Sequence, residues 1–192
     1  MTINTKTLAA IDIGTNAIRL FISNVEEYPT ETLFKKIAFL RVPIRLGEDV
    51  FTTGEIGQQK GKRLCETMQG FSYIMSAFNV ESYKAYATCA MREARNGKSV
   101  AEQIQKECDL NIEIISGTKE AETIFAGGMN EVVDDDKTYL YVDVGGGSTE
   151  VIVYSKSVKV EACSFPLGTV RMLNDAVDKE EMKHFKKWLK NI

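Results

Sequence analysis

The sequence is poor in the residues that build several common kinds of functional site. Its 192 residues include a single histidine, His184, in a lysine-rich stretch, so a mechanism that rests on a histidine base is disfavoured. The four cysteines are widely spaced and form no CxxC pair: Cys65, Cys89, Cys108 and Cys163. This spacing argues against a zinc site or a disulfide framework, and reduced thiols are expected.

Long apolar runs and a strong net charge are also missing. No apolar stretch approaches the ~18 residues of a membrane span, and the N-terminal MTINTKT has no signal-peptide core, so we expect a cytoplasmic protein without a membrane partner. The formal net charge of −3 gives no general attraction for polyanions, so phosphate binding would need a local cluster. The basic and aromatic run KHFKKWLK fits an amphipathic helix better than base stacking, and we expect no nucleic-acid partner.

What is present is an ordinary globular composition, 44% hydrophobic and 27% charged. Periodicity predicts two strands joined by a turn in 8–25, further strands in 36–46, 82–87, 112–115 and 159–165, and helices in 57–78, 100–108, 118–132 and 179–189. The third strand slips phase near Arg41, which predicts a bulge. Residues 47–54 are expected to form a loop, 167–175 a loop or short helix, and 134–136 a polar linker. Antiparallel strands followed by alternating helices and strands predict an α/β domain with a mixed sheet.

The most informative stretch is YLYVDVGGGSTEVIVY, at 139–154. Its apolar runs predict two strands, and the glycines at 145–147 allow positive φ, so the turn can tighten and direct N–H groups at an anion. Ser148 and Thr149 add hydroxyl donors, while Asp143 and Glu150 flank the loop with carboxylates. This arrangement suits a phosphate with Mg²⁺, which prefers a few carboxylates, phosphate oxygens and water. The alternative is a hairpin that only turns the chain.

A similar pattern occurs earlier in the chain. Shifting Asp12 onto Asp143 (143 − 12 = 131 positions) aligns Gly14 with Gly145 and Arg19 with Glu150. One hairpin in each half predicts a two-copy repeat, with equivalent loops facing a cleft, unless the match arose by chance. Only 49 residues follow Asp143 (192 − 143 = 49). We therefore expect a first lobe at 1–133, a partial second lobe at 137–192, and a fragment of a longer protein.

Four blocks in order, DIGTNAIRL, ATCAMREARN, IISGTKEAETIFAGG and VDVGGGSTEV, resemble the exopolyphosphatase/guanosine pentaphosphate phosphohydrolase (Ppx/GppA) family, and FPLGTVRM also fits. The matches run from Ile11 to about Met172. The resemblance implies an α/β, actin-like (ribonuclease-H-like) two-lobe fold whose second lobe is incomplete here. It also implies a Mg²⁺-dependent hydrolase that releases terminal phosphate from inorganic polyphosphate, guanosine pentaphosphate or both, and a homodimer when complete.

By resemblance, Glu120 in GTKEA is the carboxylate that activates water. Hydrolysis of a phosphoanhydride needs an in-line water, which a placed carboxylate can orient and deprotonate. The alternative is an acidic residue in the first helical turn that only interacts with the helix dipole. Glu122, two residues further on, should point to another face.

The resemblance assigns Asp143 and Glu150 to Mg²⁺, with Asp12 as the equivalent acid of the first lobe. It assigns Arg19 and Arg92 to phosphate, because a guanidinium can bond two oxygens at once. The remaining phosphate contacts would come from Thr15 and Asn16 and, opposite them, Gly145, Gly146, Gly147, Ser148 and Thr149. Where the family commonly has serine, this chain has Thr15 and Ala17, and the alanine loses one hydroxyl.

Simpler roles remain open for two of these positions, and for Asn96, which lies near Arg92 in a turn signalled by Asn-Gly. Asp12 could be a hydrogen-bonded carboxylate at a strand end, Arg92 a surface ion pair, and Asn96 only a turn residue. Two other functions are also open. An actin-like ATPase or sugar kinase shares such loops but needs an adenosine pocket, normally formed late in the second lobe. A non-catalytic sensor of polyphosphate or guanosine tetraphosphate would bind without turnover.

Overall fold

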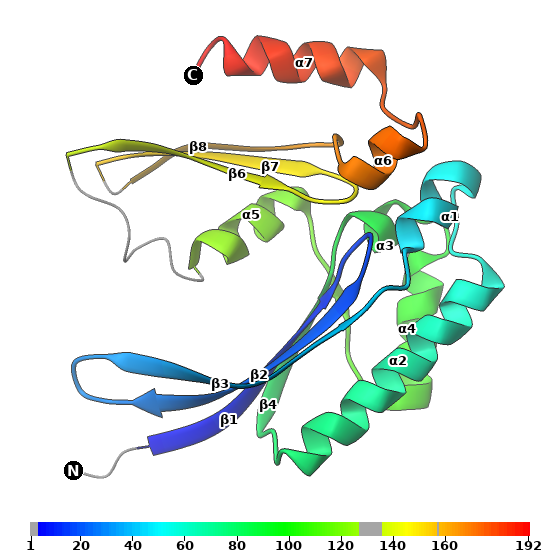
Figure 1. Ribbon diagram of the computed structural model, residues 1–192, viewed down its shortest axis with the longest axis vertical. Helices are drawn as coiled ribbons and strands as arrows, with labels where there is room; N and C mark the ends of the chain where they lie inside the picture. The colour runs from blue at the N-terminus through cyan, green and yellow to red at the C-terminus, as the bar shows by residue number, and fades with distance from the viewer. Residues whose placement is uncertain (1–3, 127–135, 157) are drawn as a thin grey trace.

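Two β-sheets carry the two predicted hairpins, one in each half of the chain (Figure 1). The computed structural model describes residues 4–126, 136–156 and 158–192. Helices lie against both sheets, so the predicted α/β class is confirmed.

The first sheet has five strands in the order β3-β2-β1-β4-β5. Their bounds are Asn4–Ile13 (β1), Ile18–Glu27 (β2), Thr32–Val42 (β3), Ser82–Ala87 (β4) and Glu113–Ile114 (β5). The first three strands are antiparallel, whereas β4 joins β1 and β5 joins β4 in parallel. The sheet is therefore mixed, as predicted.

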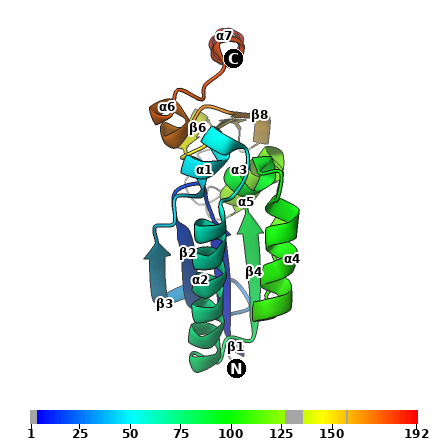
Figure 2. The same cartoon turned by 90° about the vertical axis from the view of Figure 1, so that its right-hand side faces the viewer.

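Two helices, α2 (Gln58–Ala77) and α4 (Gly97–Cys108), cover one face of the first sheet (Figure 2). Their buried side chains pack with Ile11 and Ile13 of β1 in the main core. Because side chains alternate along a strand, Asp12 points to the face opposite α2 and α4. None of the helices in the described residues is both long and apolar enough to cross a membrane.

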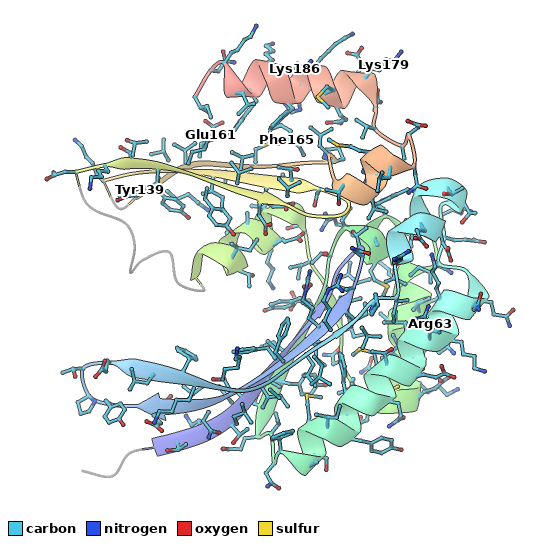
Figure 3. All side chains as sticks on the ribbon, in the orientation of Figure 1. Arg63, Tyr139, Glu161, Phe165, Lys179 and Lys186 are labelled. Atoms are coloured by element: carbon cyan, nitrogen blue, oxygen red, sulfur yellow. The ribbon has the colours of Figure 1, made fainter. Side chains whose placement is uncertain are left out.

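The second sheet consists of β6 (Thr138–Val144), β7 (Thr149–Ser155) and β8 (Val158–Phe165), all antiparallel. Helix α5 (Gly117–Ala126) packs on one face and α7 (Lys179–Leu189) on the other (Figure 1). Phe185 and Trp188 of α7 contact the ring of Phe165, so the aromatic residues of the basic run face the sheet, as expected. Figure 3 shows Phe165 on the α7 side of the sheet and Tyr139 on the other side.

Helix α5 precedes the expected lobe boundary at residue 133, yet its Ala121 packs against Ile152 of the second sheet. The part of the predicted helix beyond Ala126 lies outside the described residues, and so do Asp134 and Asp135 of the expected linker. In the described chain, one face of the second sheet is therefore packed against a helix that comes before the expected boundary.

The predicted repeat is present in the backbone. Asp12 pairs with Arg19 in the first hairpin, and Asp143 pairs with Glu150 in the second, at the same offset. Each turn closes with the same bond, Gly14 N to Ala17 O at 3.2 Å and Gly145 N to Ser148 O at 2.9 Å. After its third strand, each half continues into a short helix, α1 (Leu46–Thr53) or α6 (Thr169–Leu173).

The prediction of a loop at 47–54 is wrong, because α1 occupies most of it. Leu46 and Val50 are four residues apart and both buried, which is a helical spacing. One such pair in a segment that also contains Gly47 and Gly54 is too little to predict a helix. Helix α3 (Cys89–Glu93) was not predicted, since five residues carry no readable period.

The third strand is shifted toward the N-terminus relative to the prediction, and it ends at Val42. Its irregular pairing lies opposite Ile22 and Ser23, not at Arg41, so the position of the predicted bulge is wrong. Helix α4 begins at Gly97, three residues before the predicted start.

Candidate active site

The two hairpin loops meet at a cleft of about 780 Å³, which α5 also lines. Its volume lies within the range of about 300–1,000 Å³ typical of small-molecule sites. Most of the site residues predicted from the sequence line this cleft: Asp12, Thr15, Asn16, Arg19, Glu120, Asp143, Gly145, Gly146, Gly147, Ser148 and Glu150. The fold thus gathers residues from both halves of the chain at one place.

Asp12 and Arg19 lie opposite each other in the first hairpin and form an ion pair between Asp12 Oδ2 and Arg19 Nη1. Burial raises the pKa of Asp12, the bond to Arg19 opposes this, and the negative charge of Asp143 raises the pKa further. Asp12 and Asp143 are therefore close enough for their charges to interact, which a purely structural strand-end carboxylate would not require.

Glu120 lies in the first turn of α5, where its N–H donates to Ser116 O at 2.9 Å. Its side chain is 18% exposed, and Oε2 lies 3.5 Å from Nη1 of Arg92. Burial raises the pKa of Glu120 to about 7, and the charges of Glu150 and Asp12 add to the effect against that of Arg92. A carboxyl group whose pKa lies near neutrality can accept and release a proton.

Glu122 points to a different face of α5 from Glu120, as expected. Glu122 pairs with Lys159 at 3.3 Å on the surface, and its side chain is 55% exposed. Arg92 does not line the cleft itself, but it joins it through Glu120 and donates to Ile115 O at 2.7 Å. Arg92 therefore forms its ion pair with Glu120, whereas the neighbouring Glu93 pairs with Arg171.

Glu150 is the most deeply buried acid of the site, with 2% of its surface exposed. Its Oε1 accepts a hydrogen bond from Ser164 Oγ at 2.8 Å, a partner that sequence reasoning missed. Burial raises the pKa of Glu150, hydrogen bonds from Ser164 and Ser148 oppose this, and the charge of Asp143 raises it further. The site therefore concentrates negative charge in a poorly solvated place, where a cation is favoured.

The reason for the three loop glycines differs from the expected one. None of them has positive φ; among the described glycines only Gly54 does. Glycine is required for space, because a Cβ on Gly147 would lie 2.4 Å from Cys89 Sγ and 2.9 Å from Thr15 Oγ1. The loop is pressed against the first lobe, and its glycines permit the close approach.

Helix α6 holds the carbonyl groups of this loop from behind. Gly145 O accepts from Thr169 N at 3.0 Å, and Gly146 O accepts from Val170 N at 2.8 Å. Gly147 O accepts from Arg171 Nε at 2.9 Å. A trans peptide directs its C=O and N–H to opposite sides, so the N–H groups that follow these carbonyls point away from α6. They belong to Gly146, Gly147 and Ser148, and no acceptor for them is found among the described residues.

The first loop is built in the same way. Asn16 O accepts from Arg45 N at 2.9 Å, and Thr15 O accepts from Gly47 N at 3.0 Å at the start of α1. The N–H groups of Asn16 and Ala17 are therefore directed away from α1, and both residues line the cleft. Each half thus presents loop amides of the kind that bind anions.

Two residues singled out from the sequence have structural roles instead. Thr149 is buried, and its hydroxyl donates to Leu167 O, so it does not reach the cleft and its predicted phosphate contact is corrected. The Asn96 amide pairs with the backbone of Ile56, accepting from N and donating to O at 2.9 Å each. Both side chains hold backbone segments in place.

Arg171, like Ser164, is a residue next to the site that sequence reasoning missed. It is 9% exposed and donates from Nη2 to the carboxylate of Glu93 at 2.6 and 2.7 Å. The available signal was one charged residue within the block FPLGTVRM, which matched the family without suggesting a chemical role.

The acids fit a magnesium ion that is shared with a substrate. In the described parts of the chain, no three His, Cys, Asp or Glu side chains are arranged to hold a metal on their own. Mg²⁺ does not need such a cage, because it commonly takes one or two carboxylates and completes its shell with phosphate oxygens and water. Asp143 also raises the pKa of both Asp12 and Glu150, so a bound cation would relieve repulsion within this set.

Comparisons with known proteins agree on one family. The model of the Ppx/GppA phosphatase family matches residues 21–192. A bifunctional 3-dehydroquinate synthase/phosphatase of Fusobacterium nucleatum is 32% identical over 168 residues, covering 85% of this chain and 25% of that protein. A putative exopolyphosphatase of Haemophilus influenzae is 28% identical over 167 residues, covering 87% of this chain and 50% of that one.

The crystal structure of an exopolyphosphatase from Cytophaga hutchinsonii has the same fold, with a TM-score of 0.80 at 26% identity over 97% of this chain and 60% of that one. The expected α/β, actin-like fold is therefore confirmed. The chain spans about half the length of the curated exopolyphosphatases that it matches.

Proposed function

Because this chain belongs to the Ppx/GppA phosphatase family, we propose that its cleft binds the end of an inorganic polyphosphate and hydrolyses the terminal phosphoanhydride bond. One observation carries the proposal: Glu120, whose pKa is raised to about 7, lines the same cleft as both anion-binding loops. A basic carboxylate next to a phosphate cradle is what this reaction requires.

The loops would hold the phosphates from two sides. The amides of Asn16 and Ala17 approach from one half, and those of Gly146 to Ser148 approach from the other. Arg19 also lines the cleft, and a guanidinium can bond two phosphate oxygens at once. Backbone donors and a guanidinium suit a polyanion without selecting any base or sugar, which favours inorganic polyphosphate.

Glu120 would orient a water molecule in line with the terminal phosphorus and accept its proton as the new P–O bond forms. The bridging P–O bond breaks, so the terminal phosphoryl group is released as orthophosphate and the shortened polyphosphate chain leaves with the bridging oxygen. Arg92 donates to Glu120 and so restrains the direction of its carboxylate.

Asp143 and Glu150, with Asp12 as a third candidate, would hold Mg²⁺ together with the substrate phosphates. The ion would supply charge neutralisation at the departing phosphate oxygens. Asp12 would contribute only in part, because Arg19 already occupies one of its oxygens.

Guanosine pentaphosphate is a second candidate substrate, and one observation favours it. Phe21 and Phe39 lie opposite each other on β2 and β3, and both line the cleft. Such a pair offers an aromatic surface for a purine base, and stacking of this kind contributes about 1–3 kcal/mol.

Phosphate release with Mg²⁺ tests the proposal, with inorganic tripolyphosphate, long-chain polyphosphate, guanosine pentaphosphate and ATP as substrates. Glu120→Gln should lower release at least about 100-fold while substrate still binds. Unchanged release by the variant would contradict the role of Glu120. Tight binding without release at high Mg²⁺ would favour a sensor, and a preference for ATP would favour an ATPase or kinase.

A further inference from the structure

Arg171 of α6 contacts both halves of the protein through one guanidinium group. Its Nε donates to Gly147 O in the second loop at 2.9 Å, and its Nη2 donates to the Glu93 carboxylate at 2.6 and 2.7 Å. Glu93 is the last residue of α3, in the first half. The guanidinium also lies over the ring of Phe51, with Cζ 4.1 Å from its centre. The Arg171 side chain is only 11% exposed, so protein groups supply most of its contacts.

Gly147 differs from the other two loop glycines in how its carbonyl is held. Main-chain N–H groups of α6 bind Gly145 O and Gly146 O, and almost any residue could provide these. Gly147 O takes its hydrogen bond from the side chain of Arg171. The N–H on the other side of the same peptide belongs to Ser148, which lines the cleft.

We propose that Arg171 is a positioning residue. By holding Gly147 O, it directs the Ser148 N–H toward the anion site, and through Glu93 it ties that direction to the first half of the protein. The proposal rests on the proposed function, since the direction of this N–H matters for activity only if the loop binds phosphate.

Stability alone does not call for a buried arginine at this place. Replacing a buried ion pair with well-packed apolar residues is often neutral or even stabilising. The planar guanidinium can reach a carbonyl and a carboxylate at once in fixed directions, which a lysine ammonium cannot reproduce. The geometry of Arg171 is therefore explained better by a role in positioning a loop carbonyl than by a role in packing alone.

Amide NMR spectra test the positioning without any ligand. In Arg171→Ala, the Gly147–Ser148 peptide loses its restraint, so the Ser148 amide resonance should move and its exchange with water should change. The Gly146 amide should move much less, because α6 backbone still holds Gly145 O. A Ser148 amide that stays in place would overturn the proposal.

Titration with inorganic tripolyphosphate tests whether Arg171 also affects anion binding by the loop. In the wild type, the amides of Gly146, Gly147 and Ser148 should all respond, and in Arg171→Ala the response of Ser148 should fall by at least half. Phosphate release should show a kcat at least about tenfold lower, with a smaller change in KM, since loss of one oriented donor typically costs about 100-fold or more. A lower melting temperature with unchanged kcat would assign Arg171 a structural role only.

Arg95→Ala is the matched control. Arg95 also donates to a carbonyl, Thr53 O at 2.9 Å, and to a carboxylate, Glu55 at 3.4 Å, but it is exposed and does not line the cleft. Its loss should leave the loop amides and kcat unchanged. Glu93→Gln should shift the Ser148 amide in the same sense as Arg171→Ala, but less.

Arg171→Lys replaces Arg171→Ala if the alanine variant does not fold, and it should fail to restore the Ser148 response. If none of the three wild-type amides responds to tripolyphosphate, the proposed function fails. The ligand-free comparison still decides whether Arg171 positions the loop, so the two failures are distinguishable.

Discussion

Asp12 and Asp143 occupy the same position in two hairpins of identical register, and the charge of Asp143 raises the pKa of Asp12 across the cleft that both line. The repeat therefore brings the carboxylates of two equivalent residues close together in the cleft. Such an arrangement is unfavourable unless a cation or a proton compensates it. The proposed Mg²⁺ would relieve this repulsion, and it would not need a complete protein cage to do so.

Removal of divalent cations should stop phosphate release, and added Mg²⁺ should restore it. Asp143→Asn should raise the Mg²⁺ concentration needed for half-maximal release by at least about tenfold, because one carboxylate ligand is lost. In metal-free buffer, the same substitution should lower the pKa of Asp12, which ¹³C NMR of its carboxyl group can measure. Release that persists in excess EDTA would rule out the metal role.

The titration of Glu120 predicts a pH dependence of stability. Its pKa rises from the ordinary 4.5 to about 7 on folding, so the folded state favours the protonated form. The stabilisation from this protonation is fully present below about pH 4.5 and is lost as pH rises through about 7. Glu120→Gln remains neutral, so its advantage over the wild type should grow with pH, by at most about 3.5 kcal/mol at ~1.4 kcal/mol per pKa unit.

Denaturant unfolding near pH 5 and near pH 8, in metal-free buffer, measures this difference. Glu122→Gln is the control, because Glu122 is exposed and pairs with Lys159 at the surface. The control should show almost no change with pH relative to the wild type. If Glu120→Gln behaves like the control, Glu120 does not carry the raised pKa.

The sequence alone could predict the parts of the site that depend on local pattern. An Asp-x-Gly turn between β-branched runs determines a hairpin, and the same pattern 131 residues later (143 − 12 = 131) predicts that Asp12 and Asp143 are equivalent. The family blocks then selected Glu120 over Glu122, and the two residues do face different ways.

The remaining features depend on packing between segments that are distant in sequence. The loop glycines give room to Cys89 and Thr15, which no local pattern can show. Thr149 donates to Leu167 O and Glu150 accepts from Ser164, because β8 and the segment after it lie beside β7. A hydroxyl next to a glycine loop looks the same in sequence whether it faces a ligand or the core.

The repeat also offers a matched pair of core and surface positions. Ile11 and Val142 are equivalent residues of β1 and β6, yet Ile11 is 2% exposed and Val142 is 48% exposed. Ile11→Ala should cost about 2–5 kcal/mol of unfolding free energy, because it opens a cavity under α2 and α4. Val142→Ala should cost less than about 1 kcal/mol. Equal losses in denaturant unfolding would mean that another surface covers Val142 in solution.

Gly168 should tolerate no side chain, although its backbone is extended. A Cβ there would lie 2.4 Å from Gly146 C and O and from Gly147 N, so α6 would have to move off the loop that it holds. Gly168→Ala should lower the unfolding free energy by about 1–3 kcal/mol, the usual cost of overpacking, and should weaken tripolyphosphate binding measured by calorimetry. Gly70→Ala is the control, because a methyl group at this position of α2 would meet nothing within 4 Å, and it should stabilise by about 1 kcal/mol with unchanged binding. Binding that survives Gly168→Ala would show that the loop does not need α6 behind it.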